Sequence, residues 1–360
     1  MKSKLSKDLA ASVRQRLLQR STKDGIDFHL TLTRYAIERL LYRLGQSAHR
    51  RKFILKGAML FIAWAGWSPR PTRDVDLLGS GDPDASKLKS IFDALCQLEV
   101  EPDGLVFDPR TIKVDDIREE QVYEGKRVRL RATLSEARID VQIDIGYGDA
   151  VFPKPVTIHF PTLLNLPSPN ILGYSRESVV AEKLEALVKL GMVNSRMKDF
   201  YDLWSLAQQF SFDGITLTRA IHATFQRRRT PLPTEAPIAL TAEFSNDATR
   251  RKMWSAFLRK NRLAHIETDL ETTIPFLQTF LLPPLQHLTQ GIKFQSHWRA
   301  GKSWKELTPI SFTSPRTYKD RRLVSSPSIA GATAARATRL RGTASLLLTC
   351  GKKSGRAIAC

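Results

Sequence analysis

A strict alternation of side chains over residues 137–147 (ARIDVQIDIGY) constrains the fold of this chain more than any other feature. Successive side chains of a β-strand point to opposite faces. Four aliphatic residues therefore share one face, and Asp140, Gln142 and Asp144 share the other. The alternation predicts a strand with one face in a hydrophobic core, and hence a sheet that exposes a polar face.

Periodicity along the rest of the chain predicts two regions of different character. Strands are predicted over 126–133 and over Val75–Leu78, the latter after the breakers Pro69 and Pro71. Helices are predicted over 6–20, 27–45, 53–67, 84–98, 176–190, 197–210, 214–227, 248–263 and 267–281. Mixed elements followed by helices alone predict an α+β domain over 1–165 and a helical domain over 170–304, joined by a proline-rich linker, Phe152–Pro169.

Charge is concentrated at the two ends of the chain. The formal net charge is +20, and residues 1–52 hold 13 Lys/Arg against 4 Asp/Glu, while residues 305–360 hold 11 against 2. Such ends either contact nucleic-acid phosphates or simply keep the chain solvated. Residues 305–360 also lose all periodicity and are rich in Ser, Thr, Ala and Arg, which predicts a basic tail of low order.

The composition excludes several classes of protein. With 42% hydrophobic and 26% charged residues over 360 positions, the chain is not wholly disordered, collagen-like or a coiled coil. Its longest nearly apolar run, Ala58–Trp67, is about half the ~20 residues of a membrane-spanning helix. No signal peptide is visible, and Cys96, Cys350 and Cys360 form no disulfide or metal-ligand pattern. We expect a cytoplasmic protein without a membrane anchor.

Two aspartates flank Val75 in the short predicted strand. Asp74 and Asp76 point to the same face of that strand, because side chains alternate. Two carboxylates on one face provide hard oxygen ligands for Mg²⁺. The alternative is a solvated strand end, since an Asp-x-Asp sequence also occurs by chance.

A third carboxylate is expected from the strand over 137–147. We choose Asp144, which lies nearest the turn at Gly146–Gly148, with Asp140 as the fallback. Three carboxylates on neighbouring strands suit a two-metal site, in which one ion activates the attacking oxygen and the other holds phosphates. The alternative is structural: the preceding strand carries Arg127, Arg129 and Arg131 on one face, and cross-strand Arg–Asp pairs would account for the acidic residues.

Two further features are compatible with a phosphate-containing ligand. Lys56 and Gly57 precede the aspartate pair, where a small residue permits close approach of a triphosphate and Lys56 supplies positive charge. Lys183 falls inside the apolar arc of the helix over 176–190, and Asp199 lies within an apolar stripe of the next helix, with Asp202 at its edge. These charges either face a cleft between the domains or form a structural salt bridge.

Together these segments resemble the AbiEii/AbiGii toxin family, nucleotidyltransferase-like proteins of bacterial type IV toxin–antitoxin and abortive-infection systems. KGAMLF, RPTRDVDLLG, VQIDIGYGDAV and YSRESVVAEKLEALVKLGMVNSRMKDFYDLW occur in the family's order, and the resemblance spans about residues 25–304. The AEKLEALV…NSRMKDFYDL block is its most specific part. One departure is visible: the family often has two glycines after the lysine, and here the second position is Ala58.

The resemblance implies a set of site residues. Asp74, Asp76 and Asp144 would hold the catalytic Mg²⁺ (or Mn²⁺). Lys56, Gly57, Thr72 and Arg73 would lie along the nucleotide phosphates. Lys183 would contact the triphosphate, and Asp199 or Asp202 would complete the site.

The resemblance also implies a reaction: transfer of a nucleoside monophosphate from an NTP, with release of pyrophosphate, to an acceptor such as tRNA. A cognate antitoxin would be the protein partner. Two other hypotheses stay open. One is a nucleotidyltransferase that modifies a protein or a small molecule. The other is a non-catalytic nucleotide- or RNA-binding protein whose acidic face is only salt-bridged.

Overall fold

The computed structural model describes the backbone of residues 2–66, 68–117, 125–263 and 268–306, and their side chains from Lys7 onwards. Residues 1–308 form one compact unit. The predicted tail lies outside the described residues from position 307 on, and the domain boundary at 165/170 stays a prediction. No helix within the described ranges combines the length and apolarity needed to cross a membrane.

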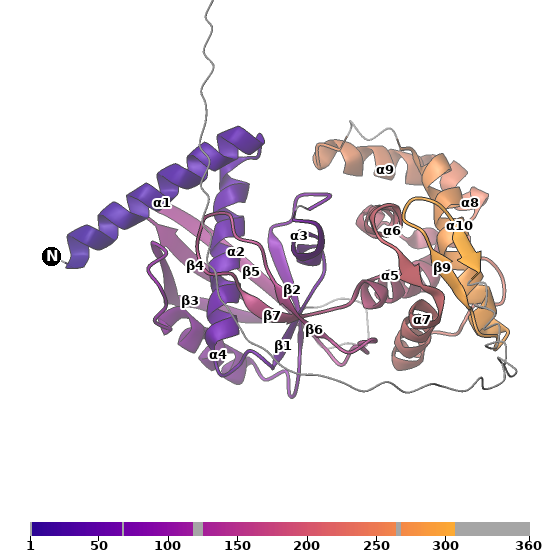
Figure 1. The fold of residues 1–360 in the computed structure, drawn as a ribbon, viewed down its shortest axis with the longest axis horizontal. Coiled ribbons are helices and arrows are strands. Elements are labelled where there is room, and N and C mark those ends of the chain that lie inside the picture. The colour runs from indigo at the N-terminus through magenta and orange to yellow at the C-terminus, as the bar shows by residue number, and fades with distance from the viewer. Residues whose placement is uncertain (1, 67, 118–124, 264–267, 307–360) are drawn as a thin grey trace, which may run out of the picture. The chain divides into compact units, whose positions relative to one another are not determined.

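The first half of the chain builds the whole seven-stranded sheet and four helices (Figure 1). The helices are α1 (Lys2–Asp24), α2 (Phe28–Gln46), α3 (Met59–Ala65) and α4 (Ala85–Gln97). The strands are β1 (Phe53–Lys56), β2 (Asp74–Gly79), β3 (Leu105–Ile117), β4 (Gly125–Leu134), β5 (Ala137–Tyr147), β6 (Val156–His159) and β7 (Asn170–Gly173).

The sheet is mixed, with the order β3-β4-β5-β2-β1-β7-β6. The pairs β2/β5 and β1/β7 are parallel, and the remaining neighbours are antiparallel. Parallel neighbours need a crossover connection, and α4 with the β3–β4 hairpin lies between β2 and β5 in the sequence. The predicted α+β class, with a mixed sheet followed by helices, is confirmed.

One face of the sheet packs against α1, α2 and α4, which contact strands β3, β4, β5 and β7. The predicted alternation of β5 is confirmed: Ile139, Val141, Ile143 and Ile145 are all buried in this core. A Ser, Thr, Asp or Asn side chain before a helix satisfies its free N–H groups. Asp27 begins α2 in this way, accepting a hydrogen bond from the Leu30 N–H at 2.9 Å. The opposite face of the sheet carries the polar side chains.

The helix predicted over 53–67 is wrong for its first four residues. Phe53–Lys56 is the central strand β1, and Gly57 then turns the chain into α3 with a positive φ of 72°. A short buried apolar run gives the same signal for a strand and a helix, so periodicity alone does not separate them. The predicted linker likewise contains β6, and β7 follows it to pair with β1. The strand β3 was not predicted.

The second half of the chain contains the predicted helices and one small sheet. The helical elements are α5 (Arg176–Leu190), η1 (Gly191–Val193), α6 (Met197–Gln209), α7 (Gly214–Arg228), η2 (Ile238–Leu240), α8 (Ala242–Asn246), α9 (Ala248–Lys260) and α10 (Leu270–Thr289). The short strands are β8 (Phe212–Asp213), β9 (Ser296–Trp298) and β10 (Trp304–Glu306), in the order β10-β9-β8. These strands have two or three residues each, too few for a period-two signal, and were not predicted.

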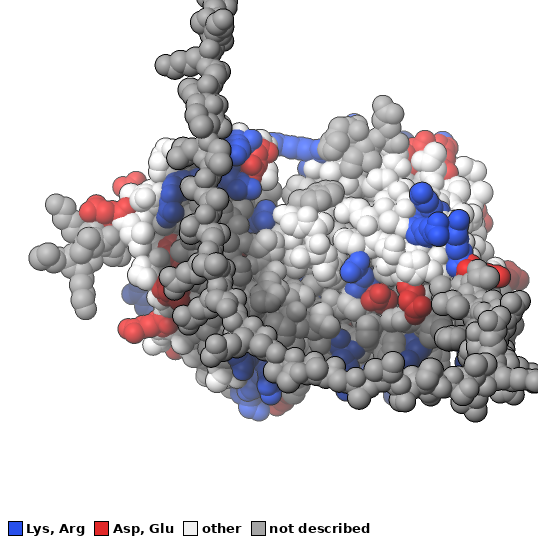
Figure 2. All heavy atoms as spheres, in the orientation of Figure 1, with Lys and Arg blue, Asp and Glu red and all other residues white. Residues whose placement is uncertain are grey.

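Charged side chains on the visible face do not separate by sign. Figure 2 shows Lys and Arg interspersed with Asp and Glu around the rim of this face, with uncharged residues over much of its centre. The basic excess of the sequence belongs to its two ends. The described middle of the chain is therefore close to electroneutral, and any strong charge effect must be local.

Candidate active site

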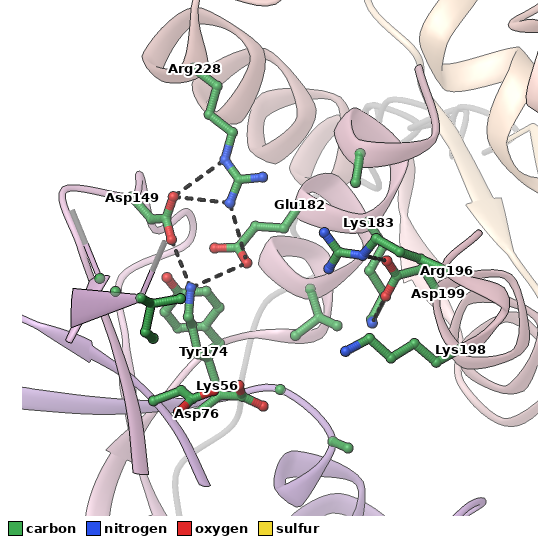
Figure 3. A pocket seen from close by; sticks show the side chains of 18 of the residues that line it. Lys56, Asp76, Asp149, Tyr174, Glu182, Lys183, Arg196, Lys198, Asp199 and Arg228 are labelled. Atoms are coloured by element: carbon green, nitrogen blue, oxygen red, sulfur yellow. Dashed lines mark hydrogen bonds and ion pairs between the residues drawn. The ribbon is translucent and has the colours of Figure 1, made fainter. Parts of the chain in front are cut away.

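A polar pocket of about 270 Å³ lies between the polar face of the sheet and helices α5, α6 and α7. Figure 3 shows charged side chains reaching into it from both sides. Six of the predicted site residues line it: Lys56, Gly57, Asp76, Asp144, Lys183 and Asp199. The other four, Thr72, Arg73, Asp74 and Asp202, are not among its lining residues.

The strand side of the pocket places two of the predicted carboxylates next to each other. In the parallel pairing of β2 and β5, Asp76 lies opposite Asp144 and Asp74 lies opposite Gln142. All these side chains share the polar face, because Val75 and Ile143 between them are buried on the other face. The fallback Asp140 lies further along β5 and is not a lining residue.

The strand-to-helix turn at Gly57 packs directly against Asp76. A Cβ atom at position 57 would overlap the Asp76 carboxylate, so a side chain is excluded there by space as well as by the positive φ. Ala58 has ordinary helical backbone angles (φ −68°, ψ −22°) and is buried. A second glycine is therefore not required by the backbone at this turn.

Asp144 is paired in this structure, as the structural alternative expected. The Arg127 guanidinium donates two hydrogen bonds to its carboxylate, at 2.8 and 2.7 Å. Arg131 donates similarly to Asp140 at 2.9 Å. Cross-strand pairs therefore account for both acidic residues of β5, but they do not extend to β2. Within the described part of the chain, the side chains of Asp74 and Asp76 have no hydrogen bond or ion pair.

The pKa values on β2 reflect this lack of partners. Burial raises the pKa of Asp76 even though the charge of Lys56 opposes it. Burial and then the negative charge of Asp144 raise the pKa of Asp74. A nearby cation would relieve both effects, because it stabilises the ionised carboxylates.

This donor set suits a divalent cation, although the side chains are not gathered around one. Among the described residues, no three His, Cys, Asp or Glu side chains form a group that could hold a metal ion as they stand. Carboxylate oxygens are the ligands that Mg²⁺ prefers, and none of the residues that the structure describes competes for Asp76. Asp144 would have to exchange Arg127 for the cation in order to join it.

A network of four charged residues closes one end of the pocket (Figure 3). Lys56 Nζ lies 2.8 Å from Asp149 Oδ2 and 3.7 Å from Glu182 Oε2. Arg228 Nη2 lies 3.0 Å from Asp149 Oδ1 and 3.6 Å from Glu182 Oε2. The two cations and two carboxylates thus link β1 and the segment after β5 to α5 and α7.

The charges in this network stabilise one another. Desolvation alone would lower the pKa of Lys56, but Glu182 and Asp149 raise it above its usual value. Burial opposes ionisation of Asp149, but Lys56 and Arg228 hold its pKa below the ordinary range. Lys56 therefore lines the pocket as predicted, but Asp149 and Glu182 already neutralise its positive charge.

A second network holds Lys183 between two buried aspartates. Lys183 Nζ lies 2.6 Å from Asp199 Oδ1 and 2.9 Å from Asp202 Oδ2. The Arg70 guanidinium donates to both oxygens of Asp202, at 2.8 and 2.9 Å. Asp202 is 0% exposed and lies behind the pocket wall, so its contacts position Arg70 and Lys183 instead of reaching a ligand.

The two alternatives predicted for Lys183 and Asp199, a position facing a cleft and a structural salt bridge, are both found. Both residues line the pocket, and they form a salt bridge with each other. Despite its burial, the pKa of Asp202 falls to about 2 because of Lys183 and Arg70. Desolvation lowers the pKa of Lys183, but Asp199 and Asp202 outweigh it and raise the value. The network therefore stays ionised at neutral pH.

Two predicted nucleotide contacts lie on the loop before β2. Arg73 is exposed, Thr72 is partly buried, and the Thr72 hydroxyl donates a long hydrogen bond of 3.4 Å to the Asp74 carbonyl. Neither lines the pocket in this structure.

Sequence reasoning missed several charged residues of the pocket. They are Arg70, Asp149, Glu182, Arg196, Lys198 and Arg228. Glu182 reaches into the pocket from α5 (Figure 3). The helix α5 contacts α6, α7, η1 and η2, so it packs against more than one neighbour. All of these residues except Arg228 had one usable signal: they lie inside the motif segments that carry the resemblance.

Comparisons with known proteins add the family. A family model described as nucleotidyl transferase AbiEii toxin, type IV TA system, matches residues 39–274. Two solved structures from Helicobacter pylori are similar: a protein assigned provisionally as a nucleotidyltransferase (16% identity, TM-score 0.39, covering 71% of this chain and 90% of that one) and JHP933 (15%, 0.39, 71% and 88%). No curated protein matches the chain.

The two structural similarities are too weak to carry an argument, so the assignment depends on the family model. That model spans well over half of the sequence and includes both walls of the pocket, from β1 to α7. The predicted family resemblance is confirmed: the chain belongs to the AbiEii family of nucleotidyl transferase toxins of type IV toxin–antitoxin systems.

Proposed function

We propose that this protein is a metal-dependent nucleotidyltransferase toxin that transfers a nucleoside monophosphate from an NTP to tRNA and releases pyrophosphate. The observation that carries the proposal is the asymmetry of the pocket. Its strand side presents Asp76, a carboxylate without a partner among the described residues, and its helical side presents Lys183 and Lys198. A metal–nucleotide complex, positive at one end and negative at the other, suits this arrangement.

The carboxylates Asp74, Asp76 and Asp144 would hold Mg²⁺ or Mn²⁺. When bound, such a cation would supply charge neutralisation and activation of the attacking oxygen. The chain's own residues do the rest. Gly57 makes space for the Asp76 carboxylate itself, and Lys56, Thr72 and Arg73 would lie along the nucleotide phosphates.

Lys183 acts as a fixed positive charge on the helical side. Asp199 contacts it from the pocket wall and Asp202 from behind, so the ammonium is oriented before a nucleotide arrives. A preorganised charge aimed at developing negative charge stabilises the transition state without reorganisation cost. We assign Lys183 and Asp199 to the reacting centre and Asp202 to positioning.

The acceptor and the setting belong to the same proposal. A polyanionic acceptor suits the basic N-terminal segment, where Lys7, Arg16 and Lys23 of α1 are exposed. NTPs and tRNA are found in the cytoplasm, where we place the reaction. Membership in a type IV toxin–antitoxin family implies a cognate antitoxin, which need not bind the toxin directly.

The test is incorporation of label from each α-³²P-labelled NTP into total tRNA by the purified protein with Mg²⁺. We expect label in RNA, loss of activity on adding EDTA, and recovery with excess Mg²⁺ or Mn²⁺. The Asp74→Asn/Asp76→Asn variant should lose at least about 10³-fold in rate, because it removes the charges that hold the cation.

Asp140→Asn is the matched control, because Asp140 shares the face of β5 with Asp144 but is 82% exposed and lies outside the pocket. It should retain activity, whereas Asp144→Asn should lose it. Label found in protein or in a small molecule, with none in RNA, would show that the acceptor is that molecule and not tRNA. No label and no metal-dependent NTP binding would show that the acidic face is structural.

A further inference from the structure

The positive charges around the pocket are nearly all neutralised by the chain itself. Lys56 and Arg228 share Asp149 and Glu182, and Lys183 lies between Asp199 and Asp202. Arg70 pairs with Asp202, and Arg196 Nε lies 2.8 Å from Asp199 Oδ2. To bind an incoming phosphate, each of these cations must interact with it in addition to its carboxylate partner or lose that partner.

Lys198 is different. It lies in the first turn of α6, between the buried residues Met197 and Asp199, which fix that turn against the protein. Lys198 itself is exposed and lines the pocket, and Figure 3 shows its side chain extending from α6 into the pocket. Within the described ranges, no carboxylate oxygen lies within salt-bridge distance of its ammonium and no hydrogen bond holds it.

The charge that complements Lys198 is on the other wall. Asp76 also lacks a partner in the described part of the chain, and the positive charge of Lys198 helps to counter the rise in its pKa caused by burial. The two groups thus interact through the pocket without forming an ion pair. Their separation leaves room between an unsatisfied anion on β2 and an unsatisfied cation on α6.

We propose that Lys198 binds the β- and γ-phosphates of the NTP and stabilises the departing pyrophosphate. This inference depends on the proposed function, since it assigns a further catalytic residue to the same reaction. In that reaction the acceptor hydroxyl oxygen bonds to the α-phosphorus and its proton passes to solvent. The bond from the α-phosphorus to the bridging oxygen breaks, and its electron pair stays on pyrophosphate.

Lys198 suits this role because its charge is uncommitted and its side chain is long and flexible. An ammonium can donate up to three hydrogen bonds to phosphate oxygens. Negative charge on the two terminal phosphates increases as the bond breaks, so a cation there stabilises the transition state more than the bound substrate. Lys183, fixed between two carboxylates, cannot follow a leaving group in the same way.

The experiment measures binding by calorimetry, with Mg²⁺ present, of the four NTPs, the matching NMPs and inorganic pyrophosphate. We expect Lys198→Ala to weaken NTP and pyrophosphate binding about tenfold, the loss of one hydrogen bond to a charged group. NMP binding should be unchanged, because an NMP lacks the terminal phosphates. Lys198→Arg should retain most of the affinity.

Lys189→Ala is the matched control: Lys189 is an exposed lysine on α5 that does not line the pocket. It should bind every ligand as the unaltered protein does. If Lys198→Ala binds NTP normally, or loses NMP and NTP affinity equally, Lys198 does not hold the terminal phosphates. In that case the proposed function still stands if the unaltered protein labels its acceptor. If the unaltered protein binds none of the four NTPs, both proposals are wrong.

Discussion

Two clusters of buried charge lie on opposite faces of the sheet, and they differ in what is left unpaired. On the helix-covered face, the α2 cluster consists of Arg39, Arg43 and Asp103. Asp103 accepts hydrogen bonds from Arg39 Nε at 3.2 Å, from Arg43 Nη1 at 2.6 Å and from the Leu105 N–H at 3.0 Å. Its carboxylate is fully used by the chain.

The pocket on the polar face holds more charges and also pairs most of them, but Asp76 and Lys198 have no ion-pair partner in the part of the chain that the structure describes. Burial and charge are therefore common to both clusters and do not by themselves indicate a site. The distinguishing feature is a pair of opposite charges that the chain brings near a hollow and does not join. We infer that the α2 cluster serves stability and the pocket serves a ligand.

The largest expected effect that tests this comparison is on stability. Asp103→Ala should lower the free energy of unfolding by about 3–5 kcal/mol, because it leaves two buried arginines without their carboxylate. Asp76→Asn should change it by less than about 0.5 kcal/mol or raise it, because it removes a half-buried carboxylate that has no partner among the described residues. Urea unfolding of both variants measures this difference, and equal destabilisation would contradict the division of roles.

The next effect concerns Glu38, a neighbour of the α2 cluster that is 0% exposed. Its Oε2 accepts the Leu163 N–H at 2.7 Å, and Arg39 Nη1 lies 3.9 Å from its Oε1. Burial raises the pKa of Glu38 from 4.5 to about 7, against the opposing charges of Arg39 and Arg34. The folded protein therefore retains a proton that the unfolded chain has already lost.

Between pH 4.5 and about 7 this difference makes stability fall as the pH rises, since the folded state binds more protons than the unfolded state. The loss should amount to about 3 kcal/mol, from roughly 1.4 kcal/mol per unit of pKa. Glu38→Gln should remove this part of the pH dependence. Urea unfolding at several pH values measures it, and parallel stability profiles for the two proteins would show that Glu38 is not buried as a neutral acid.

The strand side of the pocket was predictable from the sequence, because a strand's geometry relates sequence directly to space. Period-two alternation placed Asp74 and Asp76 on one face, and the same rule placed Asp144 on the polar face of β5. The parallel pairing of these two strands then brings Asp76 opposite Asp144, in a register that only the structure shows. The structure adds that Arg127 donates hydrogen bonds to Asp144, a pairing that the sequence offered only as an alternative.

The helical side was only partly predictable. Lys183 and Asp199 were found because each is a charge within an apolar stripe. Glu182 was missed because a helical wheel assumes one buried face, and α5 is packed on several sides. Lys198 gives no periodicity signal at all: an exposed lysine is ordinary in any sequence, and only the position of α6 shows that this one faces the pocket.

The smallest expected effect concerns Arg127, whose ion pair with Asp144 would compete with binding of the cation. Arg127→Gln should make Mn²⁺ bind about threefold more tightly, since a partly exposed ion pair is worth less than about 1 kcal/mol and its loss frees Asp144. Arg131→Gln is the control. Arg131 lies on β4 like Arg127, but it pairs with Asp140 of β5, which lies outside the pocket. Titration followed by the electron spin resonance of free Mn²⁺ measures both. Tighter binding only in Arg127→Gln would make Asp144 a third ligand in competition with an arginine. Equal affinities in all three proteins would instead leave Asp74 and Asp76 to hold the cation alone.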